Sequence, residues 1–312
     1  MRNNQIILGS GGTIGSLLAK DLKKYTNQIR LFSRNPKKIN EDDILISGTL
    51  LDTNETTNAL QDIDVAYLVV GLPYETKVWE RDFVKIVQNV INACKIHKTT
   101  LVFFDNVYLY DPEYFEELDE ETPIKSTSKK GAVRVAISNL LHKEIKNNDI
   151  NVLIVRSADF YGLNISNSMF NEQVINRILS GKKANWFLDA NKKHSLTFVE
   201  DASKATAMLG NINSAYNQVW HLPTDKAYTA NELVKIISNI TGKPAKIKVA
   251  NKLMITILGW FIPAVKESKE LLYQYDRDYE FKSDKFQNAT GIKPTSIELG
   301  LTKIIKNFKP LK

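Results

Sequence analysis

Short apolar runs alternate with amphipathic segments through the first half of the chain. The runs that predict strands lie at residues 5–10, 28–33, 42–48, 64–71, 99–106 and 151–157. The segments that predict helices have helical spacing of apolar positions and no internal proline, and lie at residues 12–25, 55–60, 75–97 and 130–146. Strands separated by helices form parallel crossover units, and runs that are apolar on both faces belong to a sheet covered on both sides. The pattern predicts an α/β fold with a doubly wound parallel sheet.

The rhythm changes after residue 157. The elements expected there are a helix at 170–179, strands at 184–188, 195–199 and 218–223, and helices starting at 201, 230 and 297. Asp201 is expected to be a helix N-cap. Thr229 and Glu232 have the spacing of a capping box, and Gly242 is expected to end that helix. We therefore expect a core at residues 1–160 and a smaller α+β lobe at 161–312, with some segments returning to the core.

Composition narrows the class of protein. The chain has 312 residues, of which 43% are hydrophobic and 25% charged, as in ordinary globular proteins. The chain has a single cysteine, Cys94, which excludes a disulfide framework and a multi-cysteine metal site. We therefore expect no metal, and we expect a reducing, cytoplasmic location. The first residues lack the pattern of a signal peptide. The net charge is +7, but the lysines are mixed with acids, so nucleic acid is not an expected partner.

The longest apolar stretch covers residues 253–265. Gly259 and Pro263 interrupt it, and it is shorter than the roughly 20 residues that a membrane span needs. It predicts a buried or interfacial helix and no membrane span.

A glycine-rich turn follows the first predicted strand. Gly9, Gly12 and Gly15 lie between this strand and the next helix, where residues without a Cβ let backbone amides approach a pyrophosphate. The order of strand, glycine turn and helix predicts a Rossmann domain that binds a nicotinamide dinucleotide. The residues expected to contact the dinucleotide are Gly9, Ser10, Gly11, Gly12, Thr13, Ile14, Gly15, Val70, Gly71 and Ser157.

The glycine spacing is GxxGxxG, and with three later segments it resembles the extended short-chain dehydrogenase/reductases of the NAD-dependent epimerase/dehydratase group. The later segments are VRSADFYG, SLTFVEDASKA and VWHLPTDKAYTANEL. The resemblance covers nearly the whole chain. It implies an enzyme in which a C-terminal lobe closes over the nicotinamide and supplies the substrate pocket.

The end of the second predicted strand bears on the choice of cofactor. An NAD enzyme usually carries an acid there, whereas this chain has Ser33 and Arg34. A guanidinium beside a hydroxyl can hold a 2′-phosphate, so NADP(H) is favoured over NAD(H). The alternatives for Arg34 are a solvated surface position or stacking on adenine.

The resemblance implies a catalytic tyrosine, a lysine four residues later, and a serine or threonine after the fifth strand. Alignment on the motifs places Ser126 at the tyrosine position, Lys130 at the lysine position and Asn106 at the serine or threonine position. A serine hydroxyl cannot replace a phenol as a general acid. Three alternatives stay open. In the first, Tyr108, Tyr110 or Tyr161 supplies the phenol, with Tyr108 ranked first, and Lys130 binds the nicotinamide ribose of the cofactor. In the second, Asn106 and Lys130 hold the substrate's negative charge without an acid. In the third, the protein binds dinucleotide without turnover.

Candidate substrate residues are Asp159, Phe160, Trp186 and His194, with Trp220 and Tyr273 as further members of an aromatic pocket. Such a pocket favours an NADP(H)-dependent oxidoreductase of a small carbonyl, enone or quinone. The alternatives are a non-catalytic dinucleotide sensor and a nucleotide-sugar epimerase or dehydratase. A sugar diphosphate usually needs an arginine pair, and the candidates for it are Arg134, Arg156 and Arg177. The expected partner is a small-molecule substrate, and a homodimer is left open.

Overall fold

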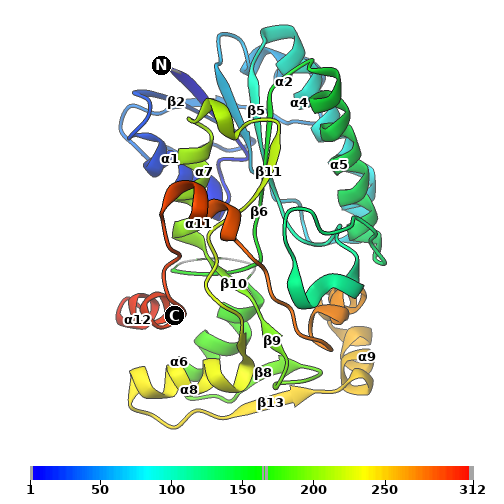
Figure 1. Ribbon diagram of the computed structural model, residues 1–312, viewed down its shortest axis with the longest axis vertical. Coiled ribbons are helices and arrows are strands. Elements are labelled where there is room, and N and C mark those ends of the chain that lie inside the picture. The colour runs from blue at the N-terminus through cyan, green and yellow to red at the C-terminus, as the bar shows by residue number, and fades with distance from the viewer. Residues whose placement is uncertain (1–2, 164, 166–167, 309–312) are drawn as a thin grey trace. The chain divides into compact units, whose positions relative to one another are not determined.

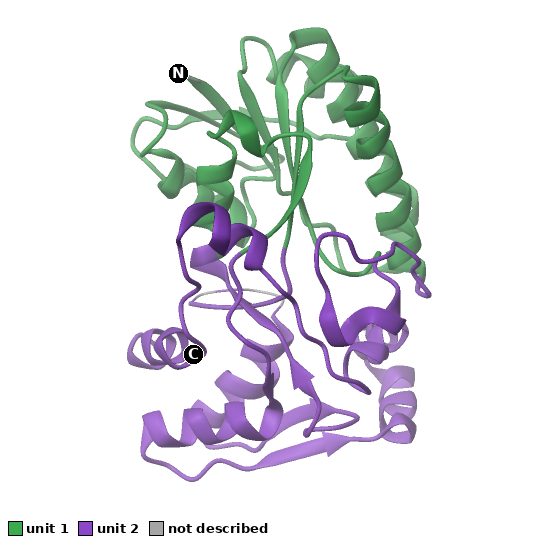
Figure 2. Cartoon of the chain, in the orientation of Figure 1, with its two compact units in different colours: residues 1–109, 129–156, 202–222 green, residues 110–128, 157–201, 223–312 purple. Residues whose placement is uncertain are grey.

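The chain forms two compact units, each of which draws on several segments of the sequence (Figure 2). The computed structural model describes residues 3–163, 165 and 168–308. Unit 1 consists of residues 1–109, 129–156 and 202–222, and unit 2 of residues 110–128, 157–201 and 223–312. The segment 202–222 thus belongs with the N-terminal core, although it follows the change of rhythm at residue 157.

Unit 1 is built on a seven-stranded parallel sheet of order β11-β6-β5-β4-β1-β2-β3. Its strands are β1 (Asn4–Leu8), β2 (Gln28–Ser33), β3 (Ile44–Ser47), β4 (Val65–Leu68), β5 (Thr100–Asp105), β6 (Val152–Arg156) and β11 (Gln218–His221). The predicted doubly wound α/β fold is confirmed. Every residue of β4 and β6 is buried, as expected of strands covered on both faces, whereas the edge strand β3 is mostly exposed.

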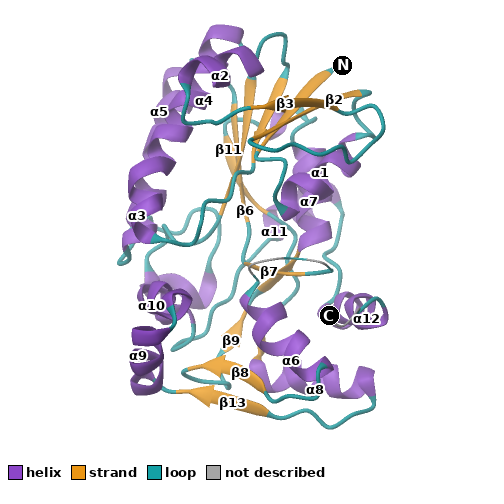
Figure 3. Ribbon diagram, turned by 180° about the vertical axis from the view of Figure 1, so that it is seen from behind, coloured by secondary structure: helices purple, strands orange, loops and turns teal. Residues whose placement is uncertain are grey.

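Helices cover both faces of this sheet (Figures 1 and 3). They are α1 (Thr13–Leu22), α2 (Thr53–Ala59), α3 (Thr76–Val78), a π-helical turn (Trp79–Phe83), α4 (Val84–His97), α5 (Lys129–Asn147) and α7 (Val199–Leu209). α1 and α7 lie on one face, and α2, α4 and α5 lie on the other. The hydrophobic core between the sheet and α2, α4 and α5 contains the single cysteine, Cys94, which is fully buried.

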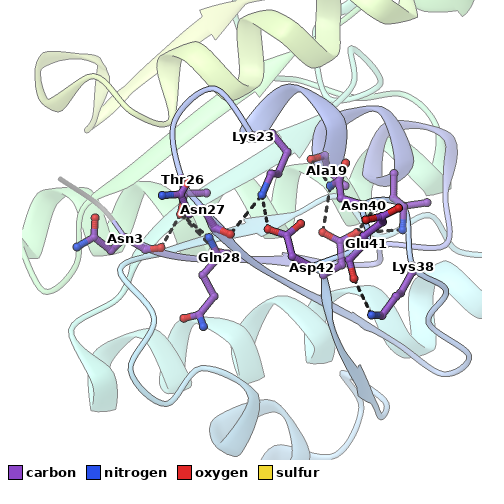
Figure 4. Close-up of polar contacts among 12 residues, drawn as sticks. Asn3, Ala19, Lys23, Thr26, Asn27, Gln28, Lys38, Asn40, Glu41 and Asp42 are labelled. Carbon is purple, nitrogen blue, oxygen red and sulfur yellow. Dashed lines mark hydrogen bonds and ion pairs between the residues drawn. The ribbon is translucent and has the colours of Figure 1, made fainter.

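Polar contacts fasten the loop between β2 and β3 to α1 (Figure 4). The Asn40 amide donates to the Ala19 carbonyl at 3.0 Å. Lys23, at the end of α1, donates to the Asn27 carbonyl and forms an ion pair with Asp42. The segment that begins with Arg34 therefore returns to the same helix that starts at the glycine turn.

Within residues 171–308, unit 2 has seven α- or 3₁₀-helical segments, and its strands form small two-stranded pairings. The strands are β7 (Asp159–Tyr161), β8 (Ala184–Phe187), β9 (Lys193–His194), β10 (Leu196–Phe198), β12 (Tyr228–Thr229) and β13 (Ile247–Ala250). The helical segments are α6 (Asn176–Leu179), α8 (Ala230–Thr241), α9 (Lys252–Phe261), α10 (Pro263–Ser268), a 3₁₀ segment (Lys269–Gln274), α11 (Asp284–Thr290) and α12 (Ile297–Lys306). The predicted capping box of α8 is present, and Gly242 ends the helix in the left-handed region.

The structure corrects two local expectations. α7 begins at Val199, so Asp201 lies inside its first turn and is not the N-cap; its carboxylate instead accepts hydrogen bonds from the backbone N and the hydroxyl of Thr295. Of the two expectations for the apolar stretch at 253–265, the buried helix is wrong, because Trp260 and Phe261 are 75% and 77% exposed, and the interfacial helix stays a prediction.

A buried ion cluster joins β5, β6 and α5 inside unit 1. The Asp105 carboxylate pairs with Arg134 and with Arg156, each at 3.2 Å, and all three side chains are at most 8% exposed. The Arg134 guanidinium also lies over the Phe83 ring, 4.2 Å from its centroid. Burial lowers the pKa of Arg134, and the neighbouring Asp105 opposes that shift. One carboxylate thus compensates two buried cations.

We predict that Asp105→Ala lowers the free energy of unfolding by about 3–5 kcal/mol, because it leaves two guanidinium groups buried without their counter-charge. Urea unfolding followed by circular dichroism measures this change. The matched control is Asp42→Ala, which removes a carboxylate from an exposed pair with Lys23 and should leave the midpoint nearly unchanged. Equal midpoints for the two variants would contradict the assignment.

Candidate functional site

Two glycines of the turn after β1 are required by close backbone approaches. Gly9 has φ +95°, and a Cβ there would lie 2.6 Å from the Cα of Val70. A Cβ on Gly15 would lie 2.8 Å from the Cα of Ser10. These two positions hold β1 against β4 and α1 against its own turn, so they serve the fold of the loop.

The other two glycines face open space. Nothing lies within 4 Å of a Cβ built on Gly11, and only the Gly9 carbonyl, at 3.7 Å, lies near one built on Gly12. Gly12 is the N-cap of α1, with no side-chain cap and no acidic residue in the first turn. The first amides of α1 therefore stay available, and the helix N-terminus favours an anion.

Two buried hydroxyls flank this loop. The Oγ atoms of Ser10 and Ser33 are buried and lack a hydrogen-bond partner among the described residues. Buried hydroxyls are usually paired, so both are donors suited to a bound polar group. Arg34, the next residue after β2, is exposed, and its carbonyl accepts from the Ser47 hydroxyl. The residues at this strand end fit the phosphates and ribose of a dinucleotide.

The sheet order places these groups at one edge. β1 lies between β4 and β2, and the chain reverses its direction of winding at β1 and β4, which is the crevice where such sheets bind ligands. Val70 and Gly71 follow β4 at the same edge, and Gly71 has open space around it. Ser157 follows β6, belongs to unit 2 and is buried.

Lys130 lies in the first turn of α5 and is fully buried. Its Nζ donates to the Thr76 hydroxyl at 2.8 Å and lies 4.6 Å from the ring centroid of Tyr74. An ammonium group over an aromatic face is stabilised by the ring quadrupole. The structure therefore places Lys130 with two residues of the segment after β4, neither of which the sequence had singled out.

The three candidate phenols have different surroundings. Tyr110 and Tyr161 are completely buried, and burial raises the pKa of Tyr161 far above its usual value, with nearby acids adding to the shift. Tyr108 is half-buried and stacks on Trp79, with ring centroids 6.2 Å apart. Of the three, only Tyr108 has exposed surface. Tyr74 is a fourth phenol, 37% exposed, in the loop after β4.

Asn106 and Ser126 both shape local turns. The Asn106 Oδ1 accepts from the backbone N of Tyr108 at 3.1 Å, which fixes the turn after β5. The Ser126 Oγ accepts from the backbone N of Ser128 at 3.2 Å, in the segment before α5. Ser126 thus has a structural partner where the family resemblance implies a phenol.

The candidate substrate residues of unit 2 differ in how deeply they are buried. His194 and Trp186 are buried in the core of unit 2, and the His194 ring stacks on Tyr275 with centroids 4.8 Å apart. His194 Nδ1 lies 3.2 Å from the Gln274 carbonyl, and Nε2 lies 2.9 Å from the Asp159 carboxylate. The two ring nitrogens thus lie between two oxygens that accept hydrogen bonds. His194 therefore orients Asp159.

Asp159 and Phe160 are half-buried and so have surface that a ligand can reach, unlike Trp186 and His194. The further aromatic candidates, Trp220 and Tyr273, are largely buried; the Trp220 indole donates to the Ala215 carbonyl, and burial raises the pKa of Tyr273 to about 12.

The fold and the glycine loop define unit 1 as a dinucleotide-binding domain of the Rossmann type. A model of the NAD dependent epimerase/dehydratase family matches residues 5–219, and the chain belongs to this family. The resemblance seen in the motifs is thus confirmed. No curated protein matches the chain at a significant level.

Solved structures similar to this chain cover nearly its whole length. A UDP-N-acetylglucosamine 4-epimerase from Bacillus cereus has a TM-score of 0.78 at 15% identity, covering 99% of each chain. A UDP-glucuronic acid 4-epimerase from Bacillus cereus, in complex with UDP-glucuronic acid and NAD, has a TM-score of 0.79 at 19% identity, covering 97% of this chain and 98% of the other. A dTDP-glucose 4,6-dehydratase from Streptomyces venezuelae with NAD bound has a TM-score of 0.77 at 13% identity, with coverage of 97% and 96%. At these identities the likeness shows the shared fold.

We predict that Gly12→Val abolishes dinucleotide binding while the protein stays folded. The backbone of Gly12 is extended, with φ −85° and ψ 170°, so valine fits the free protein, but its branched side chain fills the space in front of the first α1 amides. Isothermal titration with NADH and NADPH measures binding. Gly15→Val is the comparison: it meets backbone atoms and should lower the melting temperature. Unchanged binding by Gly12→Val would show that this glycine serves only the turn.

Proposed function

We propose that the protein binds a nicotinamide dinucleotide at the edge formed by β4, β1 and β2 and catalyses an epimerase- or dehydratase-type reaction that includes hydride transfer. The observation that carries this proposal is the pair of open glycines, Gly11 and Gly12, at the uncapped N-terminus of α1. When bound, the nicotinamide ring supplies a hydride acceptor and donor. The pyrophosphate would lie on the α1 amides, with Ser10 beside it.

The choice between the two dinucleotides rests on the end of β2. The similar structures contain NAD, which is an argument for NAD as the cofactor of this chain. Against it, the end of β2 carries Ser33 and Arg34 and no acid. We propose a preference for NADP(H), because the unpartnered Ser33 hydroxyl and the exposed guanidinium of Arg34 suit a 2′-phosphate.

Lys130 is proposed to bind the nicotinamide ribose. Lys130 lies at the start of α5, and its Nζ contacts the Thr76 hydroxyl and the Tyr74 ring. Lys130 is fully buried, so this role requires the segment of Tyr74 and Thr76 to uncover its Nζ; a ribose hydroxyl that then reaches it gains a charge-assisted hydrogen bond.

Tyr108 is the proposed proton-handling group. It follows β5 at the carboxyl edge of the sheet, and Asn106 fixes the turn that carries it. Its phenol can accept or release the proton of a reacting hydroxyl, a role that Ser126 cannot fill, since an aliphatic alcohol is far less acidic than a phenol of pKa about 10.

The proposed substrate is a hydroxylated compound of the nucleotide-sugar class, as in the similar epimerases and dehydratase. The second candidate is the small carbonyl, enone or quinone. A specific observation favours it: Arg134 and Arg156 are committed to Asp105 inside unit 1, so neither is available to clamp a diphosphate. Of the three arginines considered, Arg177 is left, and its Nε donates to the Lys183 carbonyl.

The experiment that tests the proposed function offers both classes to the protein. UDP- and dTDP-sugars are incubated with NAD or NADP and followed by proton NMR, while aldehydes, ketones, enones and quinones are incubated with NADPH and followed by absorbance. Conversion of a nucleotide sugar supports the main proposal, and NADPH oxidation by a carbonyl compound supports the second. Tight dinucleotide binding without turnover in either panel would identify a sensor.

We predict that Arg34→Ala removes most of a preference for NADPH over NADH. Losing a charge-assisted hydrogen bond to the 2′-phosphate should weaken NADPH binding by about 1.5–3 kcal/mol and leave NADH binding almost unchanged. Titration calorimetry with both cofactors measures the difference. Lys24→Ala, which removes a like charge beyond the other end of α1, is the control. Equal affinities of the parent protein for NADH and NADPH would overturn the preference.

We predict that Tyr108→Phe lowers the turnover rate by about 10² to 10⁴, the usual effect of losing a general acid, because it removes one oxygen and keeps the stacking on Trp79.

Ser126→Ala should leave the rate nearly unchanged. Lys130→Ala should weaken dinucleotide binding and lower the rate together. The rates are measured with the substrate that the panel identifies, and a large loss in Ser126→Ala would contradict the alignment of the catalytic segment.

A further inference from the structure

α9 presents its apolar side chains to solvent. Leu253, Ile257, Trp260 and Phe261 are 69%, 44%, 75% and 77% exposed. Their spacing of i, i+4, i+7 and i+8 places them on one face of the helix, and the buried residues Ile255 and Gly259 lie on the opposite face. We call these four residues the α9 stripe.

The stripe continues beyond the helix end. Ile262 is 44% exposed, and Pro263 and Ala264, at the start of α10, are also exposed. Contiguous exposed apolar surface of this kind marks an interaction site, whereas exposed apolar residues scattered singly do not.

The chain segment that carries the stripe is predominantly basic. Between residues 243 and 266 the chain has five lysines and no aspartate or glutamate. All five are exposed: Lys243, Lys246, Lys248, Lys252 and Lys266. The first acids beyond this segment are Glu267 and Glu270, which alternate with the exposed Lys269.

We propose that the α9 stripe and its lysines form a docking surface for an anionic lipid bilayer. An apolar face with Trp and Phe on a lysine-rich segment matches the chemistry of a helix that lies in the membrane interface. Trp and Phe enter the boundary between headgroups and acyl chains, and the lysines meet anionic headgroups. The helix lies on the bilayer: no helix in the described part of the chain combines the length and hydropathy of a membrane span.

A bilayer suits this surface better than a second copy of the chain. In a two-fold symmetric contact each copy presents the same patch, so an interface centred on the stripe would bring together two copies of a segment, residues 243–270, that has six lysines and only two glutamates. An anionic bilayer supplies the missing negative charge.

The chain carries its own reporter for the test. Of its four tryptophans, Trp79, Trp186 and Trp220 are at most 7% exposed, and only Trp260 is exposed. Vesicles of phosphatidylglycerol mixed with phosphatidylcholine are titrated into the full chain, with vesicles of phosphatidylcholine alone as comparison. We expect a blue shift of tryptophan emission, and co-flotation with the mixed vesicles that weakens in high salt.

The double variant Trp260→Ser, Phe261→Ser should lower the flotation partition coefficient at least about tenfold, because both rings leave the interface. The matched control is Ile96→Ser, Tyr114→Ser, which removes two other exposed apolar side chains and should leave partitioning unchanged. Circular dichroism checks that both variants are folded.

Absence of flotation, or equal flotation of the double variant and the control, would overturn the proposal. So would sedimentation showing a concentration-dependent dimer that the double variant abolishes, without vesicle association, since a second copy would then be the occupant. None of these measurements requires dinucleotide or substrate, so the outcome is independent of the proposed function.

Discussion

The approach of β1 to β4 at Gly9 is the constraint on which the binding edge of unit 1 depends. At this point the chain leaves the sheet in the left-handed region, with its Cα so close to Val70 that no side chain fits. The amides of Gly9 and Ser10 both turn toward the Phe32 carbonyl at the end of β2. The turn is therefore fixed by both neighbouring strands, and α1 begins where its free amides face the edge shared by β4, β1 and β2. A bulkier residue at Gly9 would displace this helix start.

α5 links the core of unit 1 to the candidate catalytic residues. Lys130 and Arg134 are four residues apart, so they lie on the same face of the helix, one turn from each other. Arg134 is fixed by Asp105 and by the Phe83 ring, and Lys130 by Thr76. Asp105 is also the last residue of β5, directly before Asn106 and Tyr108. The buried ion cluster thus sets the position of the Lys130 helix and of the Tyr108 turn at once, a reason for such a cluster that does not depend on its net stability.

The sheet and its glycine turn were predictable because their signals are local. Each strand is an apolar run, and each glycine lies at a fixed offset from a strand end. Contacts between distant segments were not predictable in this way. Asp201 looked like a cap, yet it accepts from Thr295, which is 94 residues away. Tyr74 and Thr76 show no motif, and only the folded chain brings them to Lys130. The exposure of the α9 stripe could not be predicted either, because an apolar helical run has the same sequence pattern whether it faces the core or solvent.

Ser126 stands at the position of the family's catalytic tyrosine, so a proton-transferring group has to be sought among the other residues. Ser126 is engaged with the Ser128 backbone and lacks the acidity of a phenol. Tyr110 and Tyr161 are sealed in unit 2, and the desolvation that raises the pKa of Tyr161 acts against any charged form of it. Tyr74 and Tyr108, in the segments after β4 and β5, have exposed surface. Tyr74 places its ring face under the Lys130 ammonium, which suits it to position the lysine. Tyr108 places its ring on Trp79, and this stacking fixes the plane of the phenol that we propose for proton transfer.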